Sequence, residues 1–203
     1  MINRYFDKIY CYSLFDAIER RESIERQAKE KGIVYSLVDA VDLRKKGDND
    51  NGVAWCHIGI NRTLVAIIDD AIKNNYKSIV VFQDDVILSD DFNQVIEENI
   101  KNVPDDWDFI SLGCFNYFPP QKIIGRVHKT KAVVMDHAIC INSKVFEDYK
   151  ELLKKEIAES DMSICRMGIE NKVNIYSIVP YIAKQGEFYS SYTGRVEKEK
   201  ECD

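Results

Sequence analysis

A stretch near the middle of the chain, residues 78–88, constrains the fold more than any other. It begins with residues typical of a buried strand, continues into Gln83, Asp84 and Asp85, and ends in a second apolar run. An unbroken apolar strand is typical of a parallel sheet that is covered on both faces. Because open α/β sheets bind ligands beyond the carboxyl ends of such strands, we expect the three polar side chains to face a crevice.

The two adjacent acids in this stretch have two interpretations. Carboxylates near a core are stable only when something pairs with them, and a divalent cation is a common partner for two acids at a strand end. On that interpretation Asp84 and Asp85 form a metal site. On the other, the acids only form a turn after a buried strand, and an isolated pair favours neither interpretation.

The residues around this stretch predict alternating strands and helices. A charged helical stretch follows the first apolar run and ends at Gly32, a common residue at helix C-termini. No glycine-rich loop follows the first run, so a P-loop or dinucleotide-binding fold lacks its central feature. The alternation favours a mostly parallel sheet. The predicted strands are 8–14, 33–38, 78–82 and 108–113, and the predicted helices are 16–31, 58–73 and a segment between Asp90 and Pro104.

The pattern changes after residue 115. Short strand-like runs, interrupted by prolines and Gly125, predict a small antiparallel annex. We therefore expect an α/β fold with a mostly parallel central sheet, flanking helices and this annex. The short runs are 116–118, 122–127 and 131–142, and they are followed by expected helices at 143–155 and 160–168, a strand at 174–179 and a charged terminal segment at 195–203.

Composition limits the class of protein. The 203 residues fit one domain, and the 45% hydrophobic and 31% charged residues are those of an ordinary globular protein. The formal net charge of -6 disfavours broad nucleic-acid binding. Six cysteines without a close pair indicate free thiols in a reducing compartment. With no apolar run long enough to span a membrane and no signal core, we expect a cytoplasmic protein without an integral membrane segment.

The order of several motifs resembles glycosyltransferase family 25, which includes lipopolysaccharide-modifying and collagen galactosyltransferases. Residues 7–10, 19–22, 32–33 and 39–42 resemble the N-terminal third of that family. The resemblance continues through 52–56, Phe82-Gln83-Asp84-Asp85-Val86, 106–109, His137 with Ser143, Asp161 and 176–186, and so covers most of the chain in the right order.

The resemblance implies a GT-A fold in a single domain over 1–203. Residues 1–115 would bind the donor nucleotide, and 116–203 would form the acceptor side and a C-terminal lid. The implied reaction moves a hexose, galactose or glucose, from a nucleotide-diphosphate sugar to a hydroxyl acceptor with inversion. A UDP-sugar is the favoured donor, the acceptor hydroxyl belongs to a glycan, a protein or a modified base, and Mn²⁺ or Mg²⁺ would bind the diphosphate.

The resemblance also implies roles on the donor side. Asp85 would bind the metal, with Asp84 second, and Gln83 stands where the family usually has glutamate, which removes one negative charge near the ion. Arg20 and Arg21 match an arginine pair that could bind phosphate in bidentate fashion, or they are a solvated helix face. Tyr10, Tyr12 and Leu14 would line the base pocket, and Gln185 and Ser190 would belong to the lid.

Three residues are candidates on the acceptor side. Asp161 matches a family acid and could act as the general base, or it could only cap a helix. His137 matches a family histidine, although a lone histidine between apolar runs is more often structural. His57 departs from the family pattern Cys-x-x-Ser-His, since Gly59 and Ile60 stand at the serine and histidine positions. His57 either replaces that histidine from a shifted position or is unrelated to it.

The residues alone also allow two other classes of function. An Asp-Asp pair after a parallel strand also occurs in Mg²⁺-dependent phosphoryl-transfer enzymes, but the accompanying nucleophile and lysine or threonine cannot be placed in this sequence. Gln83 and the absent Ser-His pair would also suit a non-catalytic module that binds sugar nucleotides or glycans.

Overall fold

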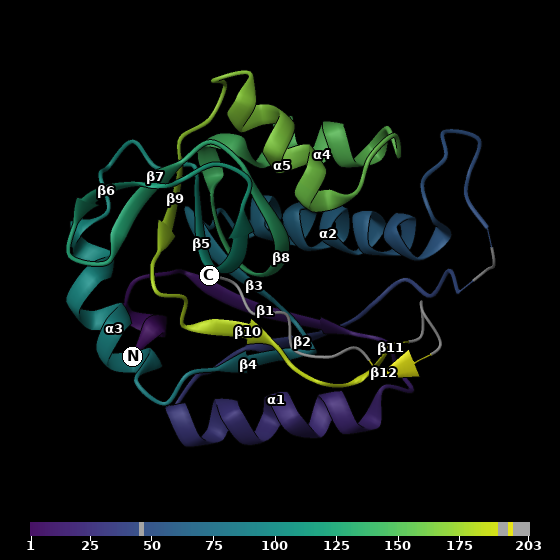
Figure 1. The fold of residues 1–203 in the computed structure, drawn as a ribbon. Coiled ribbons are helices and arrows are strands. Elements are labelled where there is room, and N and C mark those ends of the chain that lie inside the picture. The colour runs from purple at the N-terminus through teal and green to yellow at the C-terminus, as the bar shows by residue number, and fades with distance from the viewer. Residues whose placement is uncertain (45–46, 191–194, 197–203) are drawn as a thin grey trace.

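The fold is built around one large mixed sheet. The computed structural model describes residues 1–44, 47–190 and 195–196 (Figure 1). The eight strands of the sheet lie in the order β2-β1-β3-β8-β5-β9-β7-β6. They are β1 (Lys8–Ser13), β2 (Ser36–Asp39), β3 (Ser78–Gln83), β5 (Phe109–Asn116), β6 (Gln121–Ile124), β7 (Val127–Thr130), β8 (Val133–Asn142) and β9 (Ile175–Ile178).

The helices and the small sheets surround this central sheet. The α-helices are α1 (Ile18–Lys31), α2 (Trp55–Lys73), α3 (Phe92–Asn99), α4 (Phe146–Lys154) and α5 (Ser160–Ile169), and the 3-10 helices are η1 (Ile2–Arg4), η2 (Ile100–Asn102) and η3 (Ser143–Val145). The two-stranded antiparallel sheets are β4 (Val86–Leu88) with β10 (Ala183–Gln185), and β11 (Tyr189–Ser190) with β12 (Arg195–Val196).

The strand directions confirm the predicted α/β class. β1 runs parallel to β2 and β3, and β5 runs parallel to β9. β8 is antiparallel to β3 and β5, and β7 is antiparallel to β9 and β6. All strands of the large sheet except β7 and β8 therefore point the same way, and the β4–β10 pair is a small antiparallel sheet beside it.

The antiparallel strands predicted as an annex lie elsewhere than expected. β8 is inserted between β3 and β5 at the centre of the large sheet, and the β6–β7 hairpin extends its edge. The physical reason is burial on both faces, because Val133 and the run from Ala138 to Ile141 are all buried. A strand without an exposed face is stable only inside a covered sheet.

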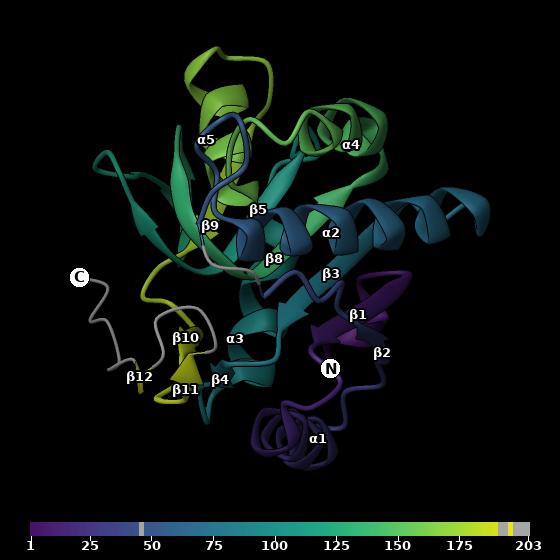
Figure 2. The same ribbon diagram turned by 90° about the vertical axis from the view of Figure 1, so that its right-hand side faces the viewer.

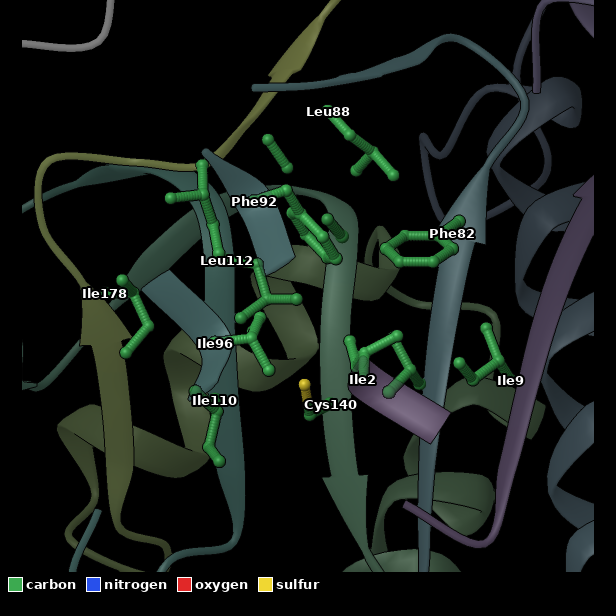
Figure 3. Close-up of a cluster of buried hydrophobic side chains, with 14 of the residues drawn as sticks. Ile2, Ile9, Phe82, Leu88, Phe92, Ile96, Ile110, Leu112, Cys140 and Ile178 are labelled. Atoms are coloured by element: carbon green, nitrogen blue, oxygen red, sulfur yellow. The ribbon is translucent and has the colours of Figure 1, made fainter. Parts of the chain in front are cut away.

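Two hydrophobic layers hold the helices against the sheet, as Figures 1 and 2 show from two sides. Successive residues of β1 alternate between them, since Ile9 and Cys11 join one cluster and Tyr10 and Tyr12 join the other. The first cluster packs beneath α1 and α3 and is drawn in Figure 3, where Phe82 faces Phe92 at a ring-centroid distance of 6.4 Å. The second lies under α2, α4 and α5.

The element boundaries agree with the sequence patterns to within a few residues. α1 ends at Gly32, whose φ of 65° is the left-handed conformation that favours glycine at a helix end. α2 begins three residues before the predicted Ile58, at Trp55, because Cys56 and His57 belong to its first turn without extending the apolar periodicity. Within the described residues, no helix combines the length and the apolar character that crossing a bilayer requires.

The cysteine prediction holds for those whose side chains are described. Cys11 and Cys140 are buried and free, and Cys56 is free and partly exposed. Cys165 is buried, and its thiol donates to the Val133 carbonyl at 2.9 Å. Burial raises the pKa of the Cys11 and Cys140 thiols, which makes them poor nucleophiles. These thiols are core residues.

Candidate active site

A cavity of about 530 Å³ lies at the carboxyl ends of β1 and β3, where open α/β sheets bind ligands. Its volume is within the usual range of small-molecule sites. The end of β1, the start of α1, the start of α2, the end of β3 and the segment after β10 all contribute to its wall. The lining residues used below are Tyr12, Ser13, Leu14, Ile18, Arg20, His57, Gln83, Asp84, Asp85, Gln185, Phe188 and Tyr189.

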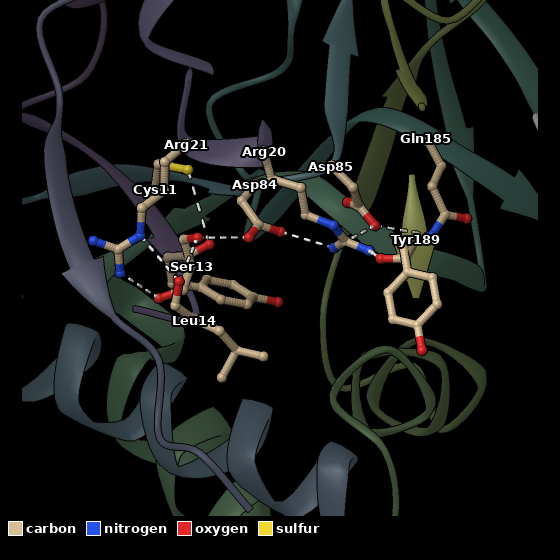
Figure 4. A network of polar contacts seen from close by, with 10 residues as sticks. Cys11, Ser13, Leu14, Arg20, Arg21, Asp84, Asp85, Gln185 and Tyr189 are labelled. Atoms are coloured by element: carbon tan, nitrogen blue, oxygen red, sulfur yellow. Dashed lines mark hydrogen bonds and ion pairs between the residues drawn. The ribbon is translucent and has the colours of Figure 1, made fainter. Parts of the chain in front are cut away.

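The two acids predicted to face a crevice lie in the turn between β3 and β4, and Figure 4 shows their contacts. Asp84 accepts hydrogen bonds from Ser13 Oγ at 2.6 Å and from Arg20 Nη1 at 3.0 Å. Asp85 Oδ2 accepts from Gln185 Nε2 at 3.0 Å and from the same Arg20 nitrogen at 3.4 Å. Burial raises the pKa of Asp84, and the charge of Arg20 opposes that shift.

One oxygen of this acid pair has no partner. Asp85 Oδ1 is buried and accepts no hydrogen bond from the described residues. A buried carboxylate oxygen without a donor is unstable unless a cation or a ligand reaches it. The described residues contain no cluster of three or more His, Cys, Asp or Glu side chains that could hold a metal. The donor set thus fits a cation that takes one or two protein carboxylates and completes its shell with oxygens of a bound phosphate.

Arg20 connects the acid pair to the segment after β10. Its Nη2 donates to the backbone carbonyl of Tyr189 at 2.9 Å, and its guanidinium lies 5.7 Å from the ring centroid of Phe188. The backbone nitrogen of Gly186 donates to the carbonyl of Asp85 at 2.7 Å. Arg20 is therefore the counter-charge of both acids, and it also fixes residues 186–189 along one side of the cavity.

Arg21, the second arginine of the predicted phosphate-binding pair, does not line the cavity. Its Nε donates to the Leu14 carbonyl and its Nη2 to the Ser13 carbonyl, both at 3.0 Å. Nη2 also lies 2.5 Å from Asp39 Oδ1 at the end of β2. The side chain thus ties the ends of β1 and β2 together, and it lies outside the cavity wall that Arg20 lines because consecutive helix positions face different sides.

Tyr10 also lies outside the cavity wall that it was predicted to form. Its hydroxyl donates to Asp70 Oδ2 at 2.6 Å, on α2. Tyr10 shares a face of β1 with Tyr12 but lies two residues further from the strand end, so it packs in the core below α2. Tyr12 and Leu14 line the cavity as expected.

Gln83 links the cavity to a second pair of acids. Its Nε2 donates to Asp136 Oδ1 at 2.9 Å, on the neighbouring strand β8. Burial and the nearby charge of Asp161 raise the pKa of Asp136 to about 7. Asp136 was not singled out from the sequence, although an acid inside the apolar run 131–142 was a visible signal.

Asp161, the predicted general base, lies in the first turn of α5 and does not line the cavity. Its Oδ1 accepts from its neighbour Met162 N at 2.7 Å, and its Oδ2 accepts from Met135 N at 2.9 Å. Met135 has a φ of 67°, a conformation that is rare for a non-glycine residue inside a strand. Asp161 thus stabilises the strained backbone beside Asp136, a role that goes beyond helix capping.

The two candidate histidines differ in exposure. His137 is buried, its Nε2 lies 3.3 Å from the Ala183 carbonyl, and burial lowers its pKa. A Cβ atom on Gly113 would approach that Nε2 to 2.7 Å, so the ring is tightly enclosed. His57 lines the cavity, with its Nε2 3.4 Å from Glu159 Oε1. The side chain of Ser190 lies outside the described part of the structure.

Comparison with the A197 protein from STIV supports the fold. The A197 protein from STIV is 11% identical, with 96% of this chain and 95% of that chain covered and a TM-score of 0.50. A glycosyltransferase involved in glycosylation of the major capsid of PBCV-1 is 14% identical, with a TM-score of 0.46 over 72% of this chain and 64% of that chain. UDP-glucose pyrophosphorylase complexed with UDP-glucose is 11% identical, with a TM-score of 0.46 over 84% and 72%. At these identities the likeness concerns the fold alone.

Comparison of sequences gives the family. A search of curated proteins returned no match. The profile of glycosyltransferase family 25 (LPS biosynthesis protein) matches residues 65–167, which is half of the chain and includes β3, both acids of the cavity, Asp136 and Asp161. The chain therefore belongs to glycosyltransferase family 25.

Proposed function

We propose that the protein transfers a hexose, galactose or glucose, from a nucleotide-diphosphate sugar to a hydroxyl acceptor, with inversion at the anomeric carbon. The observation that carries the proposal is the Asp84–Asp85 pair at the base of the cavity, with one buried Asp85 oxygen left without a partner. Family membership supports glycosyl transfer, and the position of the cavity beyond β1 and β3 supports a nucleotide donor.

The donor would occupy the cavity from the β1 side to the acid pair. Tyr12, Leu14 and Ile18 provide an aromatic and apolar wall for a base, and a UDP-sugar is the donor we favour. Arg20 lies within 3.4 Å of both acids, so its guanidinium is close enough to pair with the diphosphate when the donor binds. Gln185 and the segment after it would cover the diphosphate and exclude water.

Asp85 and Asp84 would hold Mn²⁺ or Mg²⁺ together with diphosphate oxygens. Such a cation, when bound, supplies a Lewis acid for the negative charge that develops on a leaving diphosphate. Ser13 fixes the orientation of Asp84, and Gln185 fixes that of Asp85. Arg20 would turn from the carboxylates toward the phosphates, because the same guanidinium can pair with either anion.

The acceptor proton would be received by the carboxylates behind Gln83. In an inverting transfer the acceptor oxygen forms a bond to the anomeric carbon while the bond from that carbon to the phosphate oxygen breaks, and a base takes the hydroxyl proton. Burial and the charge of Asp161 raise the pKa of Asp136 to about 7, and a base that titrates near neutral pH suits this task. We assign the proton to this pair as a unit, since both oxygens of Asp161 already accept backbone hydrogen bonds.

Calorimetric titration with UDP-sugars, with and without Mn²⁺, tests the proposal when combined with donor hydrolysis. Metal-dependent binding with slow hydrolysis supports the transferase, whereas binding without turnover supports a non-catalytic binding module. Asp85→Ala should lose metal-dependent binding. Asp90→Ala, which removes an exposed acid outside the cavity wall, should not.

The proposal leaves the chemical class of the acceptor to be identified by experiment. Hydroxyls of a glycan, a protein or a modified base could all reach the same cavity, and the net charge of -6 mildly disfavours nucleic acid. Incubation with UDP- and GDP-sugars followed by an acceptor screen, read by mass spectrometry, identifies the class. Transfer to none of the acceptors, in a protein that binds donor, would contradict the assignment.

A further inference from the structure

The charges of the chain are unevenly distributed, and one segment stands apart. Residues 109–135 contain no aspartate or glutamate, although the whole chain has a formal net charge of -6. The same segment contains four basic residues, Lys122, Arg126, Lys129 and Lys131. A local basic region on an acidic protein points to an anionic partner.

The structure places this segment at an exposed edge. β6 is the outermost strand of the large sheet, and all of its residues are exposed. Tyr117, Phe118, Ile123 and Ile124 are large apolar side chains with exposed fractions of 60, 47, 42 and 53%. Single exposed apolar residues are common, but four within eight consecutive positions form a patch.

The basic residues of the segment differ in whether they have an ion-pair or hydrogen-bond partner. Arg126 pairs with Asp91 at 3.2 Å, and Lys129 donates to Asn174 Oδ1 at 2.8 Å. Lys122 and Lys131 are exposed and have no ion pair among residues 1–44, 47–190 and 195–196. Two free positive charges therefore border the apolar patch.

We propose that this surface docks on an anionic lipid membrane. We call it the hairpin surface and define it by Tyr117, Phe118, Lys122, Ile123, Ile124 and Lys131. Aromatic and aliphatic side chains bury at the headgroup boundary, while lysines approach the anionic headgroups. Each basic residue near such a surface raises the partition roughly fivefold, so two lysines and a small apolar patch give reversible attachment.

A second copy of the chain is a weaker candidate for this surface. Pairing of β6 with β6 of another copy would satisfy the strand edge, but it would bring Lys122 of both copies together. Docking of the hairpin surface on a membrane would also leave the cavity of the candidate active site accessible. In Figure 1 the β6–β7 hairpin lies on the left of the molecule, and β11, which borders the cavity, lies on the right. The proposal does not depend on the proposed reaction.

Vesicle flotation of the full chain tests the proposal. We expect binding to vesicles of equal parts phosphatidylcholine and phosphatidylglycerol, weaker binding as salt rises, and no binding to phosphatidylcholine alone. Lys122→Glu with Lys131→Glu should lower the partition more than tenfold, since each charge is reversed. Phe118→Ser with Ile124→Ser should lower it severalfold, and because these residues are exposed the melting temperature should stay close to that of the wild type.

The matched control is Lys73→Glu with Lys155→Glu, which makes the same change in net charge at exposed positions outside the hairpin surface. This control should keep most of the binding. The proposal is overturned by wild-type protein that does not float with anionic vesicles, or by a control that loses as much binding as the hairpin variant. A dimer that the hairpin substitutions abolish would also overturn it, in favour of a second copy.

Discussion

The two pairs of acids near the cavity are stabilised in opposite ways. Asp84 and Asp85 share a cation, the guanidinium of Arg20. Asp136, by contrast, accepts hydrogen bonds from neutral side chains, the amide of Gln83 and the hydroxyl of Ser160, and Asp161 accepts from backbone N–H groups. The same residue type thus lies beside a guanidinium in one place and is held by neutral donors in the other.

The difference has a chemical consequence. Carboxylates that lie beside a guanidinium suit the binding of metal and phosphate, because that positive charge can pair with either anion. A buried carboxyl without a cation beside it, such as Asp136, has a raised pKa and suits the transfer of a proton. We therefore propose that the site has a donor end at Asp84 and Asp85 and a proton-accepting end at Asp136 and Asp161. Four substitutions test this division.

The largest effect is expected from Asp85→Ala. The substitution removes the unpartnered oxygen and half of the acid pair, so turnover should fall on the order of a thousandfold, which is about 4 kcal/mol of transition-state stabilisation. The measurement is kcat/KM over a Mn²⁺ titration, with circular dichroism to show that the fold is intact. Full activity in this variant would remove Asp85 from the donor end.

Asp136→Asn tests the proton-accepting end. Burial and Asp161 raise the pKa of Asp136 to about 7, whereas an unfolded aspartate titrates near 4. Between these values the folded protein keeps a proton that the unfolded chain releases, so wild-type stability should fall as the pH rises across this window. The variant should lose that slope, and its turnover should fall on the order of a hundredfold. Denaturant unfolding and kcat across a pH series give both quantities.

Asp161→Asn is the control for that experiment. It removes the charge that helps to raise the pKa of Asp136, so the pH at which wild-type activity rises should move downward. Turnover should fall more than donor affinity. A stability slope between about pH 4 and 7 that persists in Asp136→Asn would assign the titration to another group.

The donor end was largely predictable from sequence, because its determinants are local. The apolar run of β3 leads directly into Gln83, Asp84 and Asp85. Open α/β sheets bind ligands beyond the carboxyl ends of their strands, so the end of β3 is expected at a binding site. Gly32 marked the end of α1 for an equally local reason. The position of β8 between β3 and β5 depends on pairing between distant segments, and no local pattern contains it.

The proton-accepting end was predicted only in part, because it too depends on packing between segments that are distant in the sequence. Asp136 reaches Gln83 because β8 lies next to β3, and Asp161 reaches Met135 because α5 packs on β8. The different surroundings of Arg20 and Arg21 could not be told from sequence, because adjacent helix positions look alike there but face different neighbours. The roles of all these residues in catalysis remain predictions.

Arg20→Ala should have an intermediate effect, and Arg21→Ala is its matched control. Removal of Arg20 leaves two buried acids without their counter-charge and a diphosphate without its guanidinium, so KM for the donor should rise about tenfold. Arg21→Ala should lower the free energy of unfolding by about 1–2 kcal/mol, since it loses hydrogen bonds to backbone carbonyls, with KM unchanged. Donor titration and denaturant unfolding of both variants separate the roles. Equal changes in KM would mean that both arginines reach the donor.

Gln83→Glu is the subtlest test, because it restores the residue that the family usually has at this position. In this chain the new carboxylate would lie within hydrogen-bond distance of Asp136, where Gln83 now donates at 2.9 Å. Two like charges so close raise the pKa of one of them, so the rise of activity should move to higher pH, and turnover at neutral pH should fall severalfold. Gln83→Met, which removes the hydrogen bond without adding charge, is the control and should shift the pH at which activity rises by a smaller amount. If Gln83→Glu instead raises activity, then position 83 acts with the cation at the donor end, and the boundary between the two ends lies behind this side chain.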